Sequence, residues 1–119
     1  MSHINSSGTG GGGGGSGVVL LNVTEVTFAQ SPYTVVPGNA FIGVDTTAGP
    51  VTLVFPTNPP VGTTYIVKDI ASNAEVNNIT LTDVSGTDSF DNTVGSYVMN
   101  TENQSADLIY VGGGDYYIW

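Results

Sequence analysis

Apolar and polar residues alternate along most of this chain in short runs of the kind that form β-strands. The first run, residues 18–29, opens apolar and then places Val23 and Glu25 on one face and Thr24, Val26 and Phe28 on the other. Further runs, rich in β-branched and aromatic residues, occupy residues 32–36, 39–45, 50–56, 63–70, 78–84, 95–100, 107–111 and 115–119. No stretch spaces its apolar residues by three and four, so we expect strands without helices.

Turn-forming residues separate these runs at intervals of about ten residues. The separators are Pro37-Gly38, Ala48-Gly49-Pro50, Asn58-Pro59-Pro60 with Gly62, Ser72-Asn73, Ser85-Gly86 and Gly112-Gly113-Gly114. Short strands at this spacing indicate a sandwich, a jelly roll or a small barrel. We predict an all-β fold, an antiparallel β-sandwich or jelly-roll-like domain.

Alternation also predicts which side chains form the core. The inward-facing set is Phe41, Val51, Leu53, Phe55, Tyr65, Val67, Ile79, Leu81, Leu108, Tyr110, Tyr117 and Trp119. A second apolar set points the other way and consists of Ile42, Val44, Ile66, Ile70, Ile109 and Val111. Either these are the scattered apolar residues that any protein surface carries, or they cover a subunit interface. The interface explanation predicts a homotrimer, because cyclic closure hides such faces without leaving an open edge.

A glycine-rich segment precedes the strands. Residues 8–17 read GTGGGGGGSG, and glycine loses more conformational freedom on ordering than any other residue, so this segment belongs outside the core. We therefore divide the chain into an extended N-terminal arm, residues 1–17, and an all-β domain, residues 18–119. The arm is either a flexible linker, native or left from cloning, or an assembly arm that docks on a neighbour. The assembly residues would then be Gly8, Gly10, Gly11, Gly12, Gly13, Gly14, Gly15 and Gly17.

Charge narrows the range of partners. Ten acidic residues accompany a single basic residue, Lys68, and the formal net charge is −9. Such a surface repels phosphate and anionic lipid, so we expect neither nucleic acid nor a membrane as partner. Only 9% of residues are charged, against about 25% in most proteins, and a Thr- and Asn-rich surface costs little side-chain entropy to bury. This composition suits a protein packed against copies of itself or a scaffold.

Other features of the sequence concern its cellular location. The chain has no cysteine, which excludes disulfides and thiolate metal sites. Its N-terminus has neither a basic start nor an apolar stretch, and no run approaches the ~20 apolar residues of a membrane span. We expect no signal peptide and synthesis in the cytoplasm.

Few residues are candidates for catalysis. His3, the only histidine, precedes the arm and has no frame to hold it against a nucleophile. Lys68 beside Asp69 is typical of a solvated or paired charge. A glycosidase needs two carboxylates at a fixed separation in a cleft, and no spacing marks such a pair. We predict a protein that is not an enzyme and that has no cofactor.

The most metal-like segment is DVSGTDSFD, residues 83–91. Asp83, Asp88 and Asp91, together with backbone carbonyls, could surround a calcium ion, although the spacing is not that of an EF-hand loop. The favoured interpretation is a turn in which Asp and Ser side chains cap their own backbone.

Much of residues 30–119 resembles a small all-β domain found in tail fibres and other surface proteins of tailed bacteriophages. The matching parts are D-x-x-A-G-P-V-T-L at residues 45–53, GTTYIVKD at residues 62–69 and the closing hairpin that ends at Trp119. These motifs mark a fold and include no catalytic residue. The resemblance implies a trimeric virion component. The chain lacks the long repetitive shaft of a fibre, which favours a compact unit fixed on a larger assembly.

The leading expectation is a virion structural protein on the particle surface. It would be a decoration or cement protein of the capsid, or a head-fibre protein, anchored by its arm to the major capsid protein or another virion protein. The alternative is a tail-fibre or spike receptor-binding domain whose Tyr, Asn and Asp side chains bind a host glycan. The favoured role of Tyr116, Tyr117 and Trp119 is to close the core. A small glycosidase is the second alternative.

Overall fold

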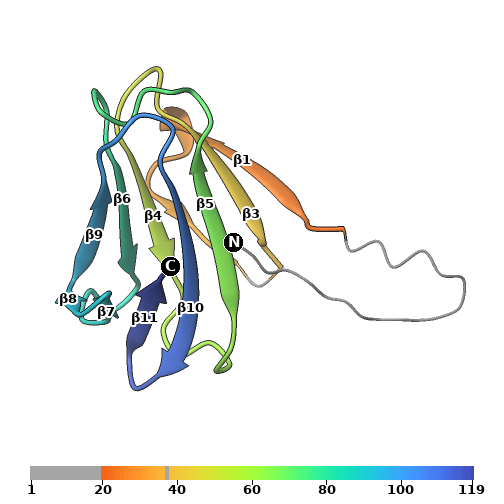
Figure 1. The fold of residues 1–119 in the computed structure, drawn as a ribbon, viewed down its shortest axis with the longest axis vertical. Coiled ribbons are helices and arrows are strands. Elements are labelled where there is room, and N and C mark those ends of the chain that lie inside the picture. The colour runs from red at the N-terminus through yellow and green to blue at the C-terminus, as the bar shows by residue number, and fades with distance from the viewer. Residues whose placement is uncertain (1–19, 37) are drawn as a thin grey trace, which may run out of the picture.

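The computed structural model describes residues 20–36 and 38–119, and these residues form an almost entirely β structure (Figure 1). One short 3-10 helix, η1 (Phe28–Gln30), interrupts the strands, and no helix of the described residues has the length and apolarity needed to cross a membrane. The strands are β1 (Val23–Thr27), β2 (Tyr33–Thr34), β3 (Phe41–Asp45), β4 (Val51–Phe55), β5 (Thr64–Asp69), β6 (Ile79–Asp83), β7 (Ser89–Phe90), β8 (Thr93–Val94), β9 (Ser96–Met99), β10 (Ser105–Gly112) and β11 (Asp115–Ile118).

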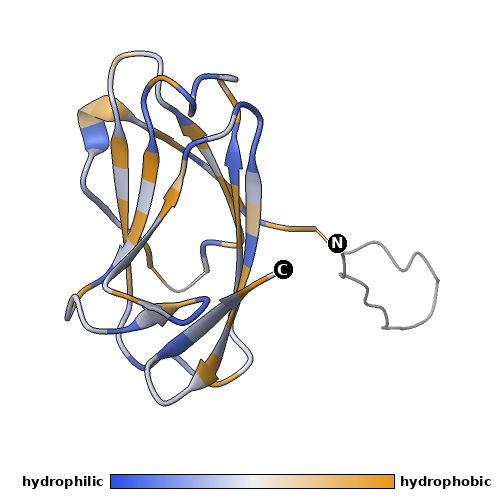
Figure 2. Ribbon diagram, turned by 60° about the vertical axis from the view of Figure 1, so that its left-hand side comes forward, coloured by the Kyte–Doolittle hydropathy of each residue, from blue (hydrophilic) through white to orange (hydrophobic). Residues whose placement is uncertain are grey.

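The strands form two sheets with the apolar core between them, which confirms the all-β sandwich class. Sheet A has the strand order β1-β3-β5-β10-β11-β7-β8, and sheet B has the order β2-β4-β6-β9. Along most strands, hydrophobic residues alternate with more polar ones (Figure 2). This period of two residues puts every second side chain into the space between the sheets.

The prediction of an antiparallel arrangement is wrong for the first half of the fold. From β1 to β6 successive strands lie alternately in sheet A and sheet B, so the chain coils around the core. Neighbours within each sheet, such as β1 with β3 and β4 with β6, are therefore parallel. Parallel neighbours require a long crossover, and here the crossover is a strand of the opposite sheet. Antiparallel pairing joins β5 to β10, β10 to β11, β6 to β9 and β7 to β8.

Most of the predicted core is confirmed. The buried members of the predicted set are Val51, Leu53, Phe55, Tyr65, Val67, Ile79, Leu81, Leu108 and Tyr110. The other members of the predicted set, Phe41, Tyr117 and Trp119, lie in β3 and at the end of the β11 hairpin. These two segments are apolar on both faces, so alternation alone cannot orient them.

The predicted orientation of β3 and β11 is wrong. In β3, Ile42 and Val44 are fully buried and Phe41 is only half-buried. In β11, Tyr116 is fully buried, whereas Tyr117 is 40% exposed; Trp119, just beyond the strand, is 57% exposed. The pairing of Tyr110 with Tyr116, beside a bulge in β10, sets this orientation. The aromatic residues of the C-terminal hairpin therefore divide between core and surface.

Candidate functional site

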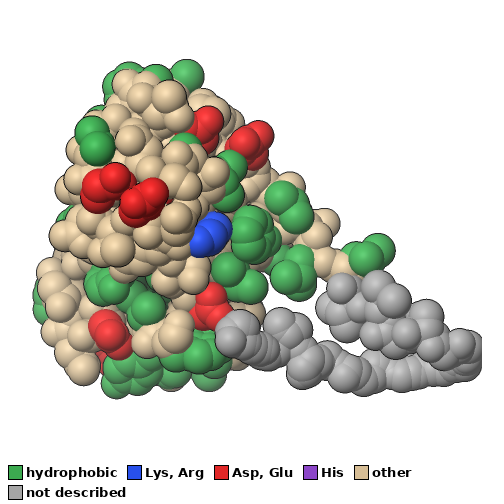
Figure 3. All heavy atoms as spheres, turned by 45° about the horizontal axis from the view of Figure 1, so that its top comes forward, with side chains coloured by type: hydrophobic (Ala, Val, Ile, Leu, Met, Phe, Trp, Pro, Cys, Tyr) green, Lys and Arg blue, Asp and Glu red, His purple; other side chains and the backbone are tan. Residues whose placement is uncertain are grey.

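The side of sheet A that faces away from sheet B, which we call the outer face, carries a row of apolar side chains. Val23 pairs with Phe41 and Phe41 with Ile66 across β1, β3 and β5, while Ile109 pairs with Tyr117 across β10 and β11. Each of Phe41, Ile66, Ile109 and Tyr117 has a buried residue beside it in its strand, so these side chains point outward. A space-filling view shows hydrophobic side chains gathered beside the single lysine (Figure 3). Ile66 and Ile109 belong to the second apolar set that alternation predicted, whereas Phe41 and Tyr117 were assigned to the core because β3 and β11 have the opposite orientation to the predicted one.

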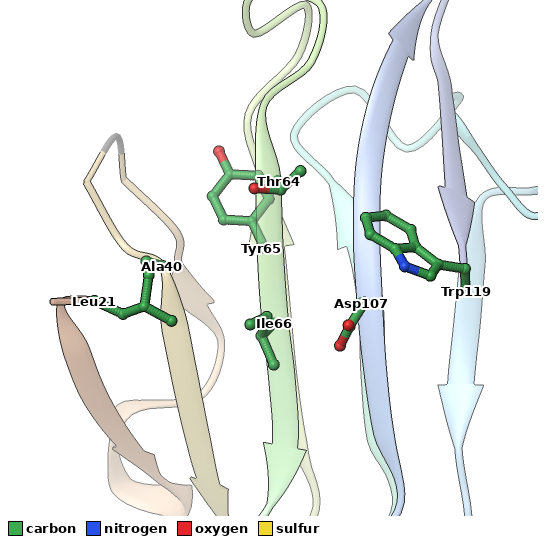
Figure 4. A pocket seen from close by; sticks show the side chains of 7 residues that line it. All are labelled: Leu21, Ala40, Thr64, Tyr65, Ile66, Asp107 and Trp119. Carbon is green, nitrogen blue, oxygen red and sulfur yellow. The ribbon is translucent and has the colours of Figure 1, made fainter. Parts of the chain in front are cut away.

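A pocket of about 130 Å³ opens on the outer face (Figure 4). β5 contributes Thr64 and Ile66, and β10 contributes Asp107, which is the register partner of Ile66. The backbone N–H of Trp119 donates to the carbonyl of Asp107 at 2.9 Å, which holds Trp119 beside it. The other lining residues are Leu21, Ala40 and Tyr65. The pocket thus has largely apolar walls around a single carboxylate.

Asp107 is buried although it lies on the outer face, with only 8% of its surface exposed. Burial raises the pKa of its carboxyl above the ordinary value of an aspartate. Lys68 lies on the same side of β5, but its ammonium donates to the carbonyl of Asn103. Asp107 was not among the residues that the sequence singled out. The available signal was a charged residue two positions from Ile109, on the same face of an apolar strand.

A second, larger pocket of about 540 Å³ adjoins the first and shares Ala40, Thr64 and Tyr65 with it. The loop between β4 and β5 forms much of its wall. Its other polar lining residues are Asn39, Thr57, Asn58 and Thr63. Together the two pockets combine an indole ring, a carboxylate, hydroxyls and amides, which are groups able to bind polar ligands.

The candidate calcium residues are only partly brought together. Asp83 accepts hydrogen bonds from the backbone N–H groups of Ser85 at 3.0 Å and Asp88 at 3.1 Å, and from the hydroxyl of Ser85. Asp91 is exposed, and its Oδ1 faces the N–H of Ile118 at 3.4 Å. No group of three or more His, Cys, Asp or Glu in the described chain is placed to hold a metal ion. The bonds of Asp83 are those of a self-capped turn; calcium binding remains an untested prediction.

Asp88 is the least satisfied carboxylate of this turn. It is 6% exposed, and its Oδ2 has no hydrogen-bond partner among the described residues. Burial, followed by the nearby charges of Asp83 and Asp115, raises the pKa of its carboxyl. An ionised Asp88 therefore costs stability, because a buried charge lacks a donor and faces like charges.

Replacing Asp88 by asparagine is expected to raise the free energy of unfolding by about 1–2 kcal/mol at pH 7. A carboxyl with a raised folded pKa favours the folded state below its unfolded pKa, and this contribution is lost as pH rises through the folded pKa. The gain from Asp88→Asn should therefore shrink as pH falls through the raised folded pKa of Asp88, and it should be lost below the unfolded pKa of about 3.9, where Asp88 is neutral in both states. Urea unfolding of the wild type and of Asp88→Asn between pH 3 and 7 measures this difference in the free energy of unfolding.

The matched control is Asp91→Asn, in the same turn. Asp91 is exposed and has a φ of 54°, a conformation that asparagine also tolerates, so its change should stay within about 0.5 kcal/mol at every pH. Equal effects of the two substitutions would show that net charge, rather than the buried Asp88, sets the response.

Neither the known protein families nor the curated proteins that were searched contain a match to this chain. The resemblance to phage surface proteins therefore depends on the motifs of residues 45–53 and 62–69 and the closing hairpin. His3 and the glycines of the predicted assembly arm lie outside the described residues.

Proposed function

We propose that this protein is a structural component of a virion surface, held there by the outer face of sheet A. Its most direct role is as a decoration or cement protein of the capsid, or as a head-fibre protein. The observation that carries the proposal is the outer face: Val23, Tyr117 and Trp119 are 73%, 40% and 57% exposed, beside the half-buried Phe41 and Ile66. Apolar surface of this kind is typical of protein–protein contacts.

The contrast between the two sheets supports this use of the outer face. The corresponding side of sheet B carries Thr52, Thr80 and Thr82, which are partly exposed and uncharged, together with Val54 and the 44% exposed Val98. Threonine hydroxyls hydrogen-bond to water readily, whereas the aromatic rings of Phe41, Tyr117 and Trp119 on the outer face present large apolar surfaces. Sheet A is therefore the side that gains most free energy when a neighbour covers it.

The proposal includes self-association as a homotrimer. β1 and β2 are end strands of the two sheets, and an edge strand has backbone N–H and C=O groups available to another chain. Cyclic closure around a threefold axis covers such edges without leaving a new one open. The N-terminal arm, residues 1–17, precedes β1 in the chain and is proposed to anchor the trimer to the major capsid protein or another virion protein.

One observation favours the receptor-binding alternative. Tyr117 and Trp119 are exposed instead of closing the core, and aromatic rings at a surface can stack on sugar rings. Asn58 and Thr63, in the adjoining pocket, provide groups that bond sugar hydroxyls. The glycosidase alternative requires two carboxylates in one cleft, and the two pockets described above contain only Asp107 between them.

The attachment proposal predicts the behaviour of a double variant, Val23→Lys with Tyr117→Lys. Both side chains are exposed, so the variant should fold, but two ammonium groups on the outer face must be desolvated on contact with a partner. When the variant is added to particles that were assembled without this protein, we expect its occupancy on them to be at least about tenfold below that of the wild type, which corresponds to 1.4 kcal/mol.

The trimer proposal predicts the mass of the wild type in solution. Light scattering should report three times the 12.2 kDa monomer mass for the wild type.

The control is Val76→Lys with Val84→Lys, which adds the same charge at sites that are 69% and 65% exposed and lie outside the strands of sheet A. Equal occupancy by both double variants contradicts attachment through the outer face. A monomeric mass at micromolar concentration contradicts the trimer. Binding to a glycan array that disappears with Tyr117→Lys supports the receptor-binding alternative.

A further inference from the structure

The pocket on the outer face contains a carboxylate that the basic side chain of the domain does not neutralise. Asp107 is 8% exposed, and Lys68, the single Lys or Arg of the chain, donates to the carbonyl of Asn103 instead. A buried carboxylate is costly when ionised and unpaired, and this cost is consistent with its raised pKa. A ligand that brings a positive charge into the pocket removes part of that cost.

The pocket walls suit the uncharged part of such a ligand. Figure 4 shows Asp107 between Ile66 and the indole ring of Trp119, with Leu21 and Ala40 on the opposite side of Ile66 from Asp107. Aliphatic walls accept a methylene stem, and an indole ring attracts a cation placed over its face. The volume of about 130 Å³ is below the roughly 300–1,000 Å³ of small-molecule sites, so it leaves room for little more than one side chain.

We propose that this pocket binds a lysine or arginine side chain of a partner protein, with the cationic group between Asp107 and Trp119 and the stem along Ile66. Charge complementarity selects a partner over a second copy of this chain, which carries a net charge of −9 and whose single Lys or Arg side chain, Lys68, is already bonded. The inference deepens the proposed attachment through the outer face and rests on it, because it names the chemical group that the partner presents.

A neutral sugar fits this pocket less well than a cation. Apart from Asp107, the pocket lining offers only the hydroxyls of Thr64 and Tyr65 and the indole N–H of Trp119, whereas a sugar needs several partners for its hydroxyls and the adjoining pocket has more of them. Hydrogen bonds from a cation to a carboxylate are roughly twice as strong as bonds between neutral groups. Sugar binding in this region would instead draw on the amides of the adjoining pocket.

The test uses the full chain and small probes, with Trp119 as the reporter, because it is the only tryptophan. Butylammonium and butylguanidinium reproduce the ends of lysine and arginine, butanol is the neutral isostere, and sodium chloride holds ionic strength constant. We expect a saturable change in tryptophan fluorescence with both cations. Butanol should bind at least about tenfold more weakly, and the comparison of the two cations tells which side chain fits better.

Two variants locate the binding. Asp107→Asn keeps the shape of the side chain and removes its charge, so it should weaken binding of both cations at least about tenfold and leave butanol unchanged. Glu25→Gln removes one exposed negative charge from β1, outside the pocket, and should leave all affinities within about twofold. Circular dichroism verifies that each variant folds, and chemical shifts of Ile66 give a second measurement that does not depend on Trp119.

Each other result overturns the inference. Equal affinity for butanol and butylammonium in the wild type means an apolar pocket without charge selection. Saturation by simple sugars but not by the cations means a glycan site. A fluorescence change with protein concentration alone, absent in Asp107→Asn, means that a second copy fills the pocket. The probes are tested on the isolated chain, so the two proposals can fail separately. If the cations do not bind, the pocket inference fails but attachment through the outer face can still hold. If the outer-face variants attach to particles as well as the wild type, the attachment proposal fails but the measured cation binding stands.

Discussion

Replacement of Asp69 by alanine is expected to lower the free energy of unfolding by about 3–5 kcal/mol. Asp69 ends β5 and is 1% exposed. Its Oδ2 accepts from the backbone N–H groups of Asn73, Ala74 and Asn103 at 3.0 Å, and its Oδ1 accepts from that of Ala71 at 3.2 Å. Alanine leaves these four donors, which belong to two different loops, without their acceptor. Urea unfolding measures the loss.

The effect of Asp69 should depend on pH. Burial acts to raise the pKa of Asp69, but its four backbone hydrogen bonds outweigh burial and the pKa lies below the ordinary value. A carboxyl with a lowered folded pKa contributes stability above its unfolded pKa of about 3.9, and this contribution is lost as pH falls through the folded pKa. The difference between the wild type and Asp69→Ala should therefore narrow in acid.

Asp45→Ala is the control for Asp69, because Asp45 accepts one backbone bond, from Thr47 at 2.9 Å, at the partly exposed end of β3. We expect it to cost about 0.5–1.5 kcal/mol. If Asp69→Ala costs no more than Asp45→Ala, the two loops do not depend on the Asp69 carboxylate.

Replacement of Phe55 by alanine, as a separate variant, is expected to lower the free energy of unfolding by about 3–5 kcal/mol. Phe55 belongs to sheet B and is fully buried. Its ring centre lies 5.0 Å from that of Tyr65, 5.9 Å from that of Tyr116 and 6.2 Å from that of Phe90, all in sheet A. Alanine removes these contacts between the sheets and leaves a cavity that surrounding rings fill only in part.

Val61→Ala is the matched control for Phe55→Ala. Val61 lies in the loop between β4 and β5 and is 73% exposed, so its truncation should change the free energy of unfolding by no more than about 0.5 kcal/mol. Thermal and urea unfolding of both variants provide the comparison. A loss below about 1 kcal/mol for Phe55→Ala would mean that the aromatic cluster does not hold the two sheets together.

The positions of the longer strands were predictable because each combines alternation with turn residues at its ends. The runs at residues 50–56 and 78–84 contain β4 and β6 within one residue of their observed bounds. β7 and β8 were not predicted, since two-residue strands carry no measurable period. Their pairing depends on β11, which supplies the partner for β7.

The candidate site was far less predictable than the strands. Asp107 and Ile66 are 41 positions apart in the sequence and become neighbours only because β5 pairs with β10 in one register. Trp119 was assigned to the core, because an apolar residue two positions from Tyr117 satisfies alternation equally well on either face. Asp69 gave no signal beyond its charge, since the four N–H groups it accepts from come from loops that the fold brings together.

The sequence by itself determined the all-β class, the length of most strands, the greater part of the core and the surplus of apolar residues. These properties depend on near neighbours in the chain, through the two-residue period of a strand and the backbone preferences of Gly, Pro and Asn. Only the tertiary structure decided that successive strands cross between sheets, that Tyr116 rather than Tyr117 is buried, and that Asp107 lies in an apolar pocket. Each of these depends on which strands pair and in which register, and a shift of one residue reverses every face without changing the local pattern.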